Sequence, residues 1–128
     1  MEPSAEVVLV VDDQTSVRAV VANIVRDCGL IPREAGDGIQ ALSMLADLKR
    51  QGVTVQLVVT DLYMPGMDGI ALIREIRQAD KRTPIVMLTT ESDPDKRNEG
   101  RQAGANAWVV KPLNPERFAE VLRRFANP

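Results

Sequence analysis

The chain of 128 residues contains no histidine. This absence excludes His-ligated zinc, catalysis by Ser-His-Asp or Cys-His arrangements, and phosphorylation of this chain on histidine. Cysteine occurs once, at Cys28, so no disulfide can form within the chain, and this usage fits a reducing compartment. Lys and Arg number 16 against 18 Asp and Glu, a formal net charge of −2. That balance provides no broad cationic surface for nucleic acid or anionic lipid.

Long apolar runs are also absent. The acidic N-terminal residues precede only the run Val7–Val11, which is too short for the core of a signal peptide, and no segment approaches the length of a membrane span. We therefore expect a cytoplasmic protein without membrane association. The length is that of one domain, so we expect a single domain over residues 1–128 with its core over about 6–125. A fragment of a longer regulator remains an alternative.

Five short apolar runs predict a parallel sheet. Four of them are β-branched and nearly continuous, which is typical of strands covered on both faces. A weaker run, Leu30–Ala35, contains Pro32, which favours a strand at the sheet edge. Strand and helix patterns alternate five times, and this predicts a doubly wound α/β sandwich with right-handed crossovers. The four strong strands are expected at Val7–Val11, Val55–Val59, Pro84–Leu88 and Ala107–Val110.

The helical segments between these runs differ in apolar content. Two amphipathic patterns end before Gly29 and Gly52, and a third begins at Ile70. The last helix has Asn114 as its N-cap. The helix expected around Asp95–Ala103 lies in a stretch that has almost no apolar side chains. We expect it to be the least stable helix, because few of its residues can anchor it to a core.

Each strong strand is followed by, or ends in, a polar residue capable of chemistry: Asp12 and Asp13, then Asp61, Thr89 and Lys111. The carboxyl ends of parallel strands share one edge of the sheet, where ligands bind at the point of strand-order reversal. Three carboxylates at one small site need a cation, and Mg²⁺ accepts carboxylates while keeping positions for water or a phosphate. With Mg²⁺ and the lysine the formal charges cancel. The pattern therefore predicts a site where a carboxylate attacks phosphorus and forms an acyl phosphate.

Each of these residues also has a purely structural interpretation. Asp12 or Asp13 would serve equally as a helix cap, Asp61 as a turn residue before Pro65, and Lys111 as a solvated surface lysine. Five such residues at one sheet edge are a less probable coincidence than one, so the constellation favours a site.

Four segments carry a resemblance to a known family: VVDD at 10–13, DLYMPGMDG at 61–69, VMLTT at 86–90 and AGANAWVVKP at 103–112. In their order and spacing they resemble the receiver domains of two-component response regulators, over roughly Glu6 to Phe125. The resemblance implies a flavodoxin-like (βα)₅ three-layer sandwich with strand order 2-1-3-4-5 and a cis Lys111–Pro112 bond. The order is taken from the known fold and not from the hydrophobic pattern.

The resemblance also implies a role for each residue of the predicted site. Asp61 would accept a phosphoryl group from a sensor histidine kinase or a phosphotransfer protein. Asp13 and Asp61, with the backbone carbonyl of Tyr63, would hold Mg²⁺, and Asp12 would act through water. Lys111 would pair with Asp61 and then with the phosphoryl oxygens.

Five further roles follow from the same resemblance. Thr89 would hydrogen-bond the phosphoryl group, and Trp108, at a position usually held by Tyr or Phe, would change conformation with it. Tyr63 and Glu91 would flank the path of the hydrolytic water. Thr90, where Ala or Gly is frequent, would narrow the approach to the acceptor. These last three residues are expected to set the lifetime of the phosphoryl group.

We therefore expect a single-domain, chemotaxis-like phosphoacceptor that catalyses only its own phosphorylation and dephosphorylation. It would switch the binding of an unknown output protein through the surface of the fourth helix, fifth strand and fifth helix, as a monomer or a phosphorylation-dependent dimer. An aspartyl-nucleophile phosphatase is disfavoured because Tyr63 stands where such enzymes carry a second Asp. A nucleotide- or flavin-binding module is disfavoured by the lack of glycine-rich phosphate motifs. A phosphorelay intermediate would have the same motifs.

Overall fold

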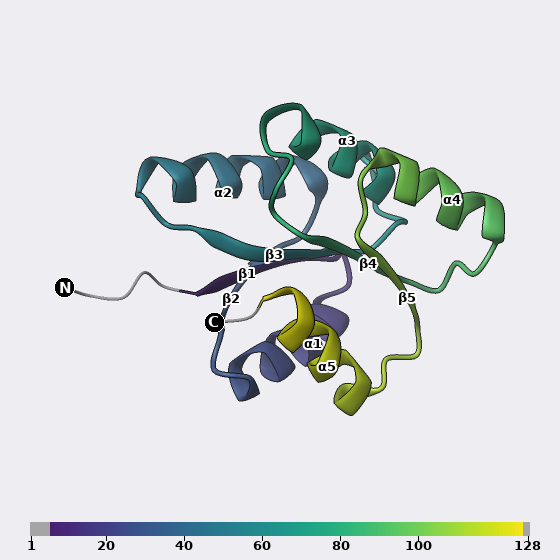
Figure 1. The fold of residues 1–128 in the computed structure, drawn as a ribbon, viewed down its shortest axis with the longest axis horizontal. Helices are drawn as coiled ribbons and strands as arrows, with labels where there is room; N and C mark the ends of the chain where they lie inside the picture. The colour runs from purple at the N-terminus through teal and green to yellow at the C-terminus, as the bar shows by residue number, and fades with distance from the viewer. Residues whose placement is uncertain (1–5, 127–128) are drawn as a thin grey trace.

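The computed structural model describes residues 6–126, in which five strands form one sheet in the order β2-β1-β3-β4-β5 (Figure 1). All four strand pairings are parallel. The predicted flavodoxin-like sheet is thus confirmed, and β2, which contains Pro32, lies at an edge as expected. The strands are β1 (Val7–Val11), β2 (Ile31–Ala35), β3 (Val55–Thr60), β4 (Ile85–Thr89) and β5 (Ala107–Val110).

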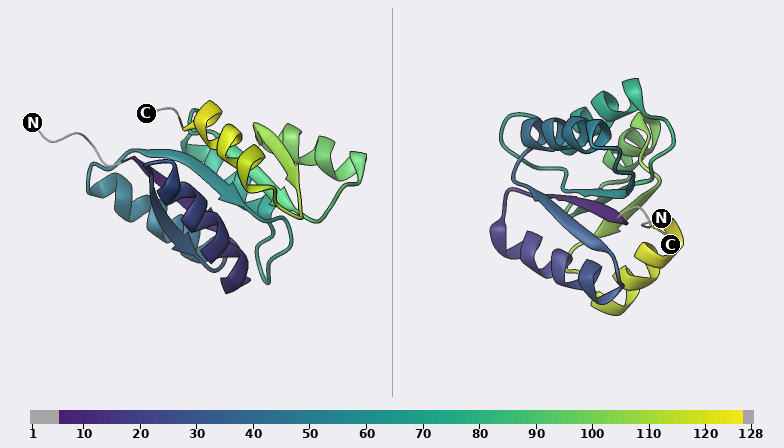
Figure 2. Two further views of the ribbon diagram at one scale, coloured as in Figure 1. Left: turned by 90° about the horizontal axis from the view of Figure 1, so that it is seen from below. Right: turned by 90° about the vertical axis from the view of Figure 1, so that its left-hand side faces the viewer.

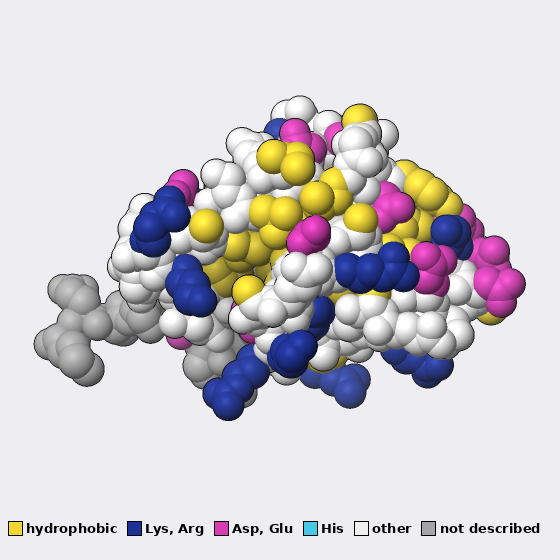
Figure 3. All heavy atoms as spheres, turned by 90° about the horizontal axis from the view of Figure 1, so that it is seen from above, with side chains coloured by type: hydrophobic (Ala, Val, Ile, Leu, Met, Phe, Trp, Pro, Cys, Tyr) yellow, Lys and Arg dark blue, Asp and Glu magenta, His cyan; other side chains and the backbone are white. Residues whose placement is uncertain are grey.

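Helices cover both faces of the sheet and complete three layers (Figures 1 and 2). One face carries α1 (Thr15–Asp27) and α5 (Pro115–Phe125); the other carries α2 (Gly38–Arg50), α3 (Gly69–Ala79) and α4 (Pro94–Ala103). Figure 3 shows the outer surface of the second layer, where apolar side chains gather between α2 and α3. Within residues 6–126, no helix has the length and apolar character needed to cross a bilayer.

The central strands contribute to two separate cores. In β1, Val8 and Val10 pack with the cluster beneath α1 and α5, whereas Leu9 and Val11 pack with the cluster beneath α2 and α3. Successive side chains of a strand point to opposite faces, so a strand between two helical layers is apolar at every position. This is why the strand segments show continuous apolar runs without alternation.

The two outer helices α4 and α5 differ sharply in what they bury. In α5, Phe118 and Leu122 are almost fully buried, whereas the only buried residue of α4 is Gly100. Side-chain caps stabilise the starts of both helices: Asn114 accepts the N–H of Arg117, and Asp93 accepts that of Asp95. The packing of α4 therefore provides the least apolar stabilisation of any helix, which supports the expectation that it is the least stable.

The first helix begins without such a side-chain cap. Its N-cap residue is Gln14, so the interpretation of Asp12 or Asp13 as the N-cap is wrong. Asp12 instead accepts the backbone N–H of Gln14 through Oδ1 at 2.9 Å. Asp12 and Asp13 each also bring a carboxylate oxygen close to Asp61 at the end of the sheet.

Candidate functional site

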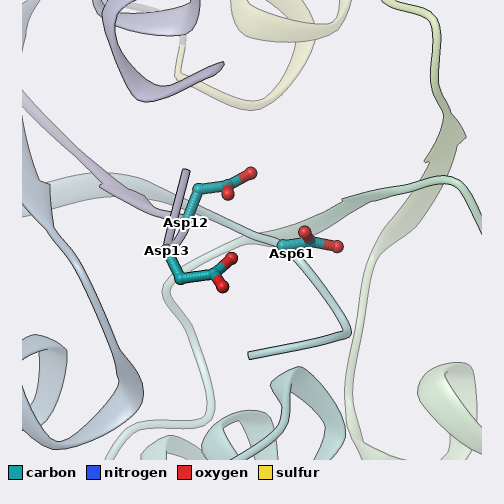
Figure 4. Close-up of side chains that lie close together, drawn as sticks. All are labelled: Asp12, Asp13 and Asp61. Atoms are coloured by element: carbon teal, nitrogen blue, oxygen red, sulfur yellow. The ribbon is translucent and has the colours of Figure 1, made fainter. Parts of the chain in front are cut away.

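Three acidic side chains meet at the carboxyl ends of β1 and β3. Asp12 and Asp13 follow β1, Asp61 follows β3, and the two strands are neighbours in the sheet. One carboxylate oxygen of each residue lies within 4.8 Å of one of each of the others. Figure 4 shows the three side chains close together at this edge of the sheet. The site that the strand ends predicted therefore exists as a spatial cluster.

Lys111, which follows β5, reaches across the sheet edge to two of the acids. Its Nζ lies 3.1 Å from Oδ2 of Asp12 and 3.2 Å from Oδ2 of Asp61. Burial by itself lowers the pKa of Lys111, but the hydrogen bond to Asp12 and the charge of Asp61 outweigh it and raise the pKa above its ordinary value. The lysine therefore remains charged. Its bond to Asp12 adds to the expected pairing with Asp61.

The two neighbouring acids Asp12 and Asp13 have opposite environments. Asp12 is 2% exposed, and burial raises the pKa of its carboxyl although the Gln14 N–H and Lys111 act in the other direction. Asp13 is exposed, and its carboxylate makes no hydrogen bond or ion pair within residues 6–126. Asp13 thus presents its oxygens to solvent, while the charge of Asp12 is already compensated by the lysine.

Asp61 is held by its own backbone and by the sheet. Its N–H donates to the carbonyl of Val11 at 3.0 Å, which continues the β1–β3 hydrogen bonding into the site. Its Oδ1 accepts the N–H of Leu62 at 2.6 Å, and Oδ2 accepts Lys111. The residue is only 8% exposed. A single buried carboxylate is therefore fixed between a backbone donor and an ammonium group.

Gly69, the first residue of α3, lies directly against the backbone of Asp61. A Cβ atom at this position would stand 2.2 Å from the Asp61 carbonyl oxygen and 3.0 Å from the Leu62 Cα. Asp68 fixes the start of this helix, because its side chain accepts the N–H of Ala71. Sequence reasoning missed this contact, because the close approach comes from tertiary packing.

Arg18 is a second residue that sequence reasoning missed. Its Nη1 donates to the carbonyl of Asp12 at 2.6 Å, and its Nε lies 3.4 Å from Oε1 of Glu34. A cation near the start of a helix is unfavourable with respect to the helix dipole. An arginine in the first turns of α1 therefore indicates that a specific hydrogen-bond acceptor, here the Asp12 carbonyl, lies nearby.

The predicted switch residue Thr89 is buried, and its hydrogen bonds are made with the backbone of its own segment and of Lys111. Its Oγ1 accepts the N–H of Glu91 at 3.3 Å, and its carbonyl accepts the N–H of Lys111 at 2.8 Å. Among the described residues, no hydrogen bond joins Thr89 to the three carboxylates. Thr90 is exposed next to it.

Glu91 connects the remaining predicted residues. Its carboxylate accepts the hydroxyl of Tyr63, and this bond raises the pKa of Tyr63 and lowers that of Glu91. The carbonyl of Glu91 accepts Nε1 of Trp108 at 2.8 Å. The indole packs so closely on α4 that a Cβ at Gly100 would lie 2.7 Å from its Cζ3. Tyr63 and Trp108 therefore share one partner, which lies two residues after Thr89.

The donor set suits a hard divalent cation. Three carboxylates converge, one of them exposed and without a partner in the described structure, and oxygen ligands of this kind are those that Mg²⁺ takes. The residues present thus fit the ion that the sequence predicted.

A flavodoxin-like sandwich with acids and a lysine at its carboxyl edge has the architecture of a signalling receiver module. The family model described as "Response regulator receiver domain" matches residues 8–123. The chain therefore belongs to the response regulator receiver family. It is a signalling module, and a phosphatase of the aspartyl-nucleophile type is not favoured.

Curated relatives support the same family. The chain is 40% identical over 118 residues to chemotaxis protein CheY-3 of Vibrio cholerae, covering 90% of this chain and 87% of the relative. It is 38% identical over 120 residues to chemotaxis protein CheY of Pseudomonas aeruginosa, covering 91% and 93%. It is also 35% identical to the DNA-binding response regulator MtrA of Mycobacterium tuberculosis, of which it spans 51%.

The fold is shared with solved structures of this family. Chemotaxis protein CheY4 of Vibrio cholerae, crystallised at low pH, superposes with a TM-score of 0.84 at 38% identity, covering 95% of this chain and 99% of that one. The chain is thus homologous to CheY proteins and to the receivers of two-component systems.

We expect Gly69→Ala to destabilise the protein, because the new methyl group collides with rigid backbone at Asp61. Gly36→Ala is the matched control, since a Cβ there meets only ordinary contacts at 3.6 Å. Chemical denaturation should give a loss of about 1–3 kcal/mol in the free energy of unfolding for Gly69→Ala and less than about 1 kcal/mol for Gly36→Ala. Equal losses would contradict the role given to the contact between Gly69 and Asp61.

Proposed function

We propose that Asp61 is the phosphoacceptor of this receiver and takes its phosphoryl group from a phosphohistidine of a sensor histidine kinase or phosphotransfer protein. One carboxylate oxygen of Asp61 attacks phosphorus, the P–N bond of the donor breaks, and its electron pair remains on the leaving imidazole. Hydrolysis of the acyl phosphate returns the carboxylate and releases inorganic phosphate. The observation that carries the proposal is the position of Asp61 between Lys111 and two other acids.

Asp13 and Asp61, with the backbone carbonyl of Tyr63, are the residues that would hold Mg²⁺, and Asp12 would act through water. The bound ion supplies positive charge to the phosphoryl oxygens and offsets the repulsion among the acids. Lys111 already pairs with Asp61 and is placed to follow the phosphoryl oxygens once they are attached. The chain itself therefore provides the nucleophile, its positioning and one fixed positive charge.

Thr89 and Trp108 form the proposed switch. The Thr89 hydroxyl oxygen accepts a long bond from the Glu91 N–H, at 3.3 Å, and within residues 6–126 its O–H donates to no side chain, so it is available to donate to a phosphoryl oxygen. Movement of Thr89 would displace Glu91, and this would alter the hydrogen bond between the Glu91 carbonyl and Trp108. The output is the binding of a partner at the surface of α4, β5 and α5, and the only reactions catalysed are the chain's own phosphorylation and dephosphorylation.

Phosphorylation is tested by intact-mass measurement after incubation with acetyl phosphate and Mg²⁺. The wild-type chain should gain the mass of one phosphoryl group, and Asp61→Asn should gain none, because an amide is not a nucleophile toward phosphorus. Omission of Mg²⁺ should abolish the gain in the wild type. If Asp61→Asn were labelled as much as the wild type, another residue would be the phosphoacceptor. If the wild type were not labelled, the result would contradict the proposed function.

The lifetime of the phosphoryl group should depend on Tyr63, Glu91 and Thr90. Tyr63 and Glu91 are bonded to each other, and the proposal gives this pair the role of screening Asp61 from water. Tyr63→Ala or Glu91→Ala should therefore accelerate loss of the label more than about twofold, or ~0.4 kcal/mol of barrier. Thr90→Ala should accelerate it in the same direction. Arg82→Ala, an exposed site before β4, is the control. Rates within about twofold of wild type in all three variants would contradict this role.

A further inference from the structure

Arg18 is a mostly buried cation beside the acidic cluster, and the proposed function does not use it. Its side chain is 18% exposed and lies in the first turn of α1. Its Nη1 donates to the Asp12 carbonyl at 2.6 Å, and its Nε lies 3.4 Å from Oε1 of Glu34 in β2. The guanidinium group also lies beside the loop after β2, where a Cβ at Gly36 would stand 3.6 Å from Nη1. Arg18 thus joins the ends of two neighbouring strands and anchors one carbonyl between them.

The anchored carbonyl belongs to the peptide group that leads into Asp13. Because a peptide group is planar, a fixed carbonyl fixes the orientation of the whole group. The peptide group on the other side of Asp13 is anchored as well, since the N–H of Gln14 donates to Oδ1 of Asp12 at 2.9 Å. Asp13 therefore lies between two fixed peptide planes, and these determine the direction of its Cα–Cβ bond.

Asp13 depends on this anchoring more than the other two acids do. Asp12 and Asp61 each accept a backbone N–H and the ammonium group of Lys111. The carboxylate of Asp13 is exposed and forms no hydrogen bond or ion pair within residues 6–126. It nevertheless brings an oxygen within 4.8 Å of an oxygen of each of the other acids (Figure 4). In the part of the chain that the structure describes, its direction therefore comes from the backbone.

We infer that Arg18 is a positioning residue of the metal site, which directs the Asp13 carboxylate toward Asp61 by holding the Asp12 carbonyl. The inference rests on the proposed function, in which Asp13 and Asp61 are ligands of Mg²⁺. It adds a residue that contacts neither the ion nor the phosphoryl group. An ion that needs both carboxylates binds more weakly when one of them is free to turn away.

A purely electrostatic role of Arg18 predicts the opposite change. Removal of a positive charge beside three carboxylates makes the local potential more negative, which favours a divalent cation. Arg18→Met removes both the charge and the hydrogen-bond donor from a long side chain. Weaker metal binding by this variant therefore identifies positioning, and tighter binding identifies a charge effect.

The test is titration of the chain with Mn²⁺ in the absence of a phosphoryl donor, with free Mn²⁺ measured by electron paramagnetic resonance. Mn²⁺ is a hard cation that takes the same oxygen ligands as Mg²⁺. Arg18→Met should raise the Kd about tenfold, and Arg18→Lys should recover part of the loss, because an ammonium group still donates to a carbonyl. Arg26→Met is the matched control, since it makes the same change at an exposed arginine in the last turn of α1. Its Kd should stay within about twofold of wild type.

A second measurement separates positioning from a general loss of stability. In labelling with acetyl phosphate, Arg18→Met should need about tenfold more Mg²⁺ for half its maximal rate, while its rate at saturating Mg²⁺ stays within about twofold of wild type. A chain that is only partly folded would instead lose rate at every Mg²⁺ concentration. If Arg18→Met does not fold, Arg18→Gln replaces it in both measurements, because its shorter side chain ends before the Asp12 carbonyl.

Several results would overturn the role of Arg18. These are an Arg18→Met chain that binds Mn²⁺ as tightly as wild type or more tightly, an Arg18→Lys chain that binds no better than Arg18→Met, an Arg26→Met chain that loses as much, or a wild-type chain that binds no Mn²⁺. The proposed function fails separately. A chain that shows the expected Mn²⁺ affinities but takes up no phosphoryl group retains the role of Arg18 and loses the proposed function. A chain that is labelled on Asp61, but whose Arg18→Met variant binds Mn²⁺ as the wild type does, has the reverse outcome.

Discussion

Electrostatic repulsion among Asp12, Asp13 and Asp61 is the constraint on which this structure depends. The acids are close because β1 and β3 are neighbours in the sheet and aspartate follows directly after each strand. Lys111 pairs with both buried acids, so that its single positive charge offsets only part of their charge, and the exposed Asp13 has no counter-charge in the described structure. A cation at Asp13 lowers the energy of this arrangement and offsets the charge of an incoming phosphoryl group, which is what a metal-assisted phosphoacceptor requires.

The repulsion persists because the surrounding backbone fixes the acids. The N–H of Asp12 donates to Ala35 and that of Asp61 to Val11, so the hydrogen bonds of the sheet continue into the site. Arg18 secures the carbonyl of Asp12, and the close approach of Gly69 determines where the chain runs after Asp61. The two apolar cores stabilise the fold, and the folded backbone keeps the three carboxylates close together against their mutual repulsion.

The sequence predicted the elements that depend on local pattern and failed on those that depend on packing. Continuous apolar runs predicted the buried strands, and Pro32 predicted an edge, because both reflect which faces of a strand are covered. The order of the strands came from the family resemblance, since no periodicity encodes it. The contacts of Arg18 with Asp12, of Gly69 with Asp61 and of Glu91 with Trp108 were not foreseen, because each joins residues whose proximity exists only after folding.

The repulsion is tested most directly by thermal unfolding of Asp13→Asn with a chelator and then with Mg²⁺. With the chelator, this variant should melt at a higher temperature than the wild type, because one uncompensated charge is gone. Mg²⁺ should raise the melting temperature of the variant less than that of the wild type. Glu120→Gln, an exposed change of equal charge on α5, should behave as wild type in both conditions. An Asp13→Asn chain that is no more stable than wild type with the chelator, and gains as much from Mg²⁺, would contradict the proposal that these acids are held together against their repulsion.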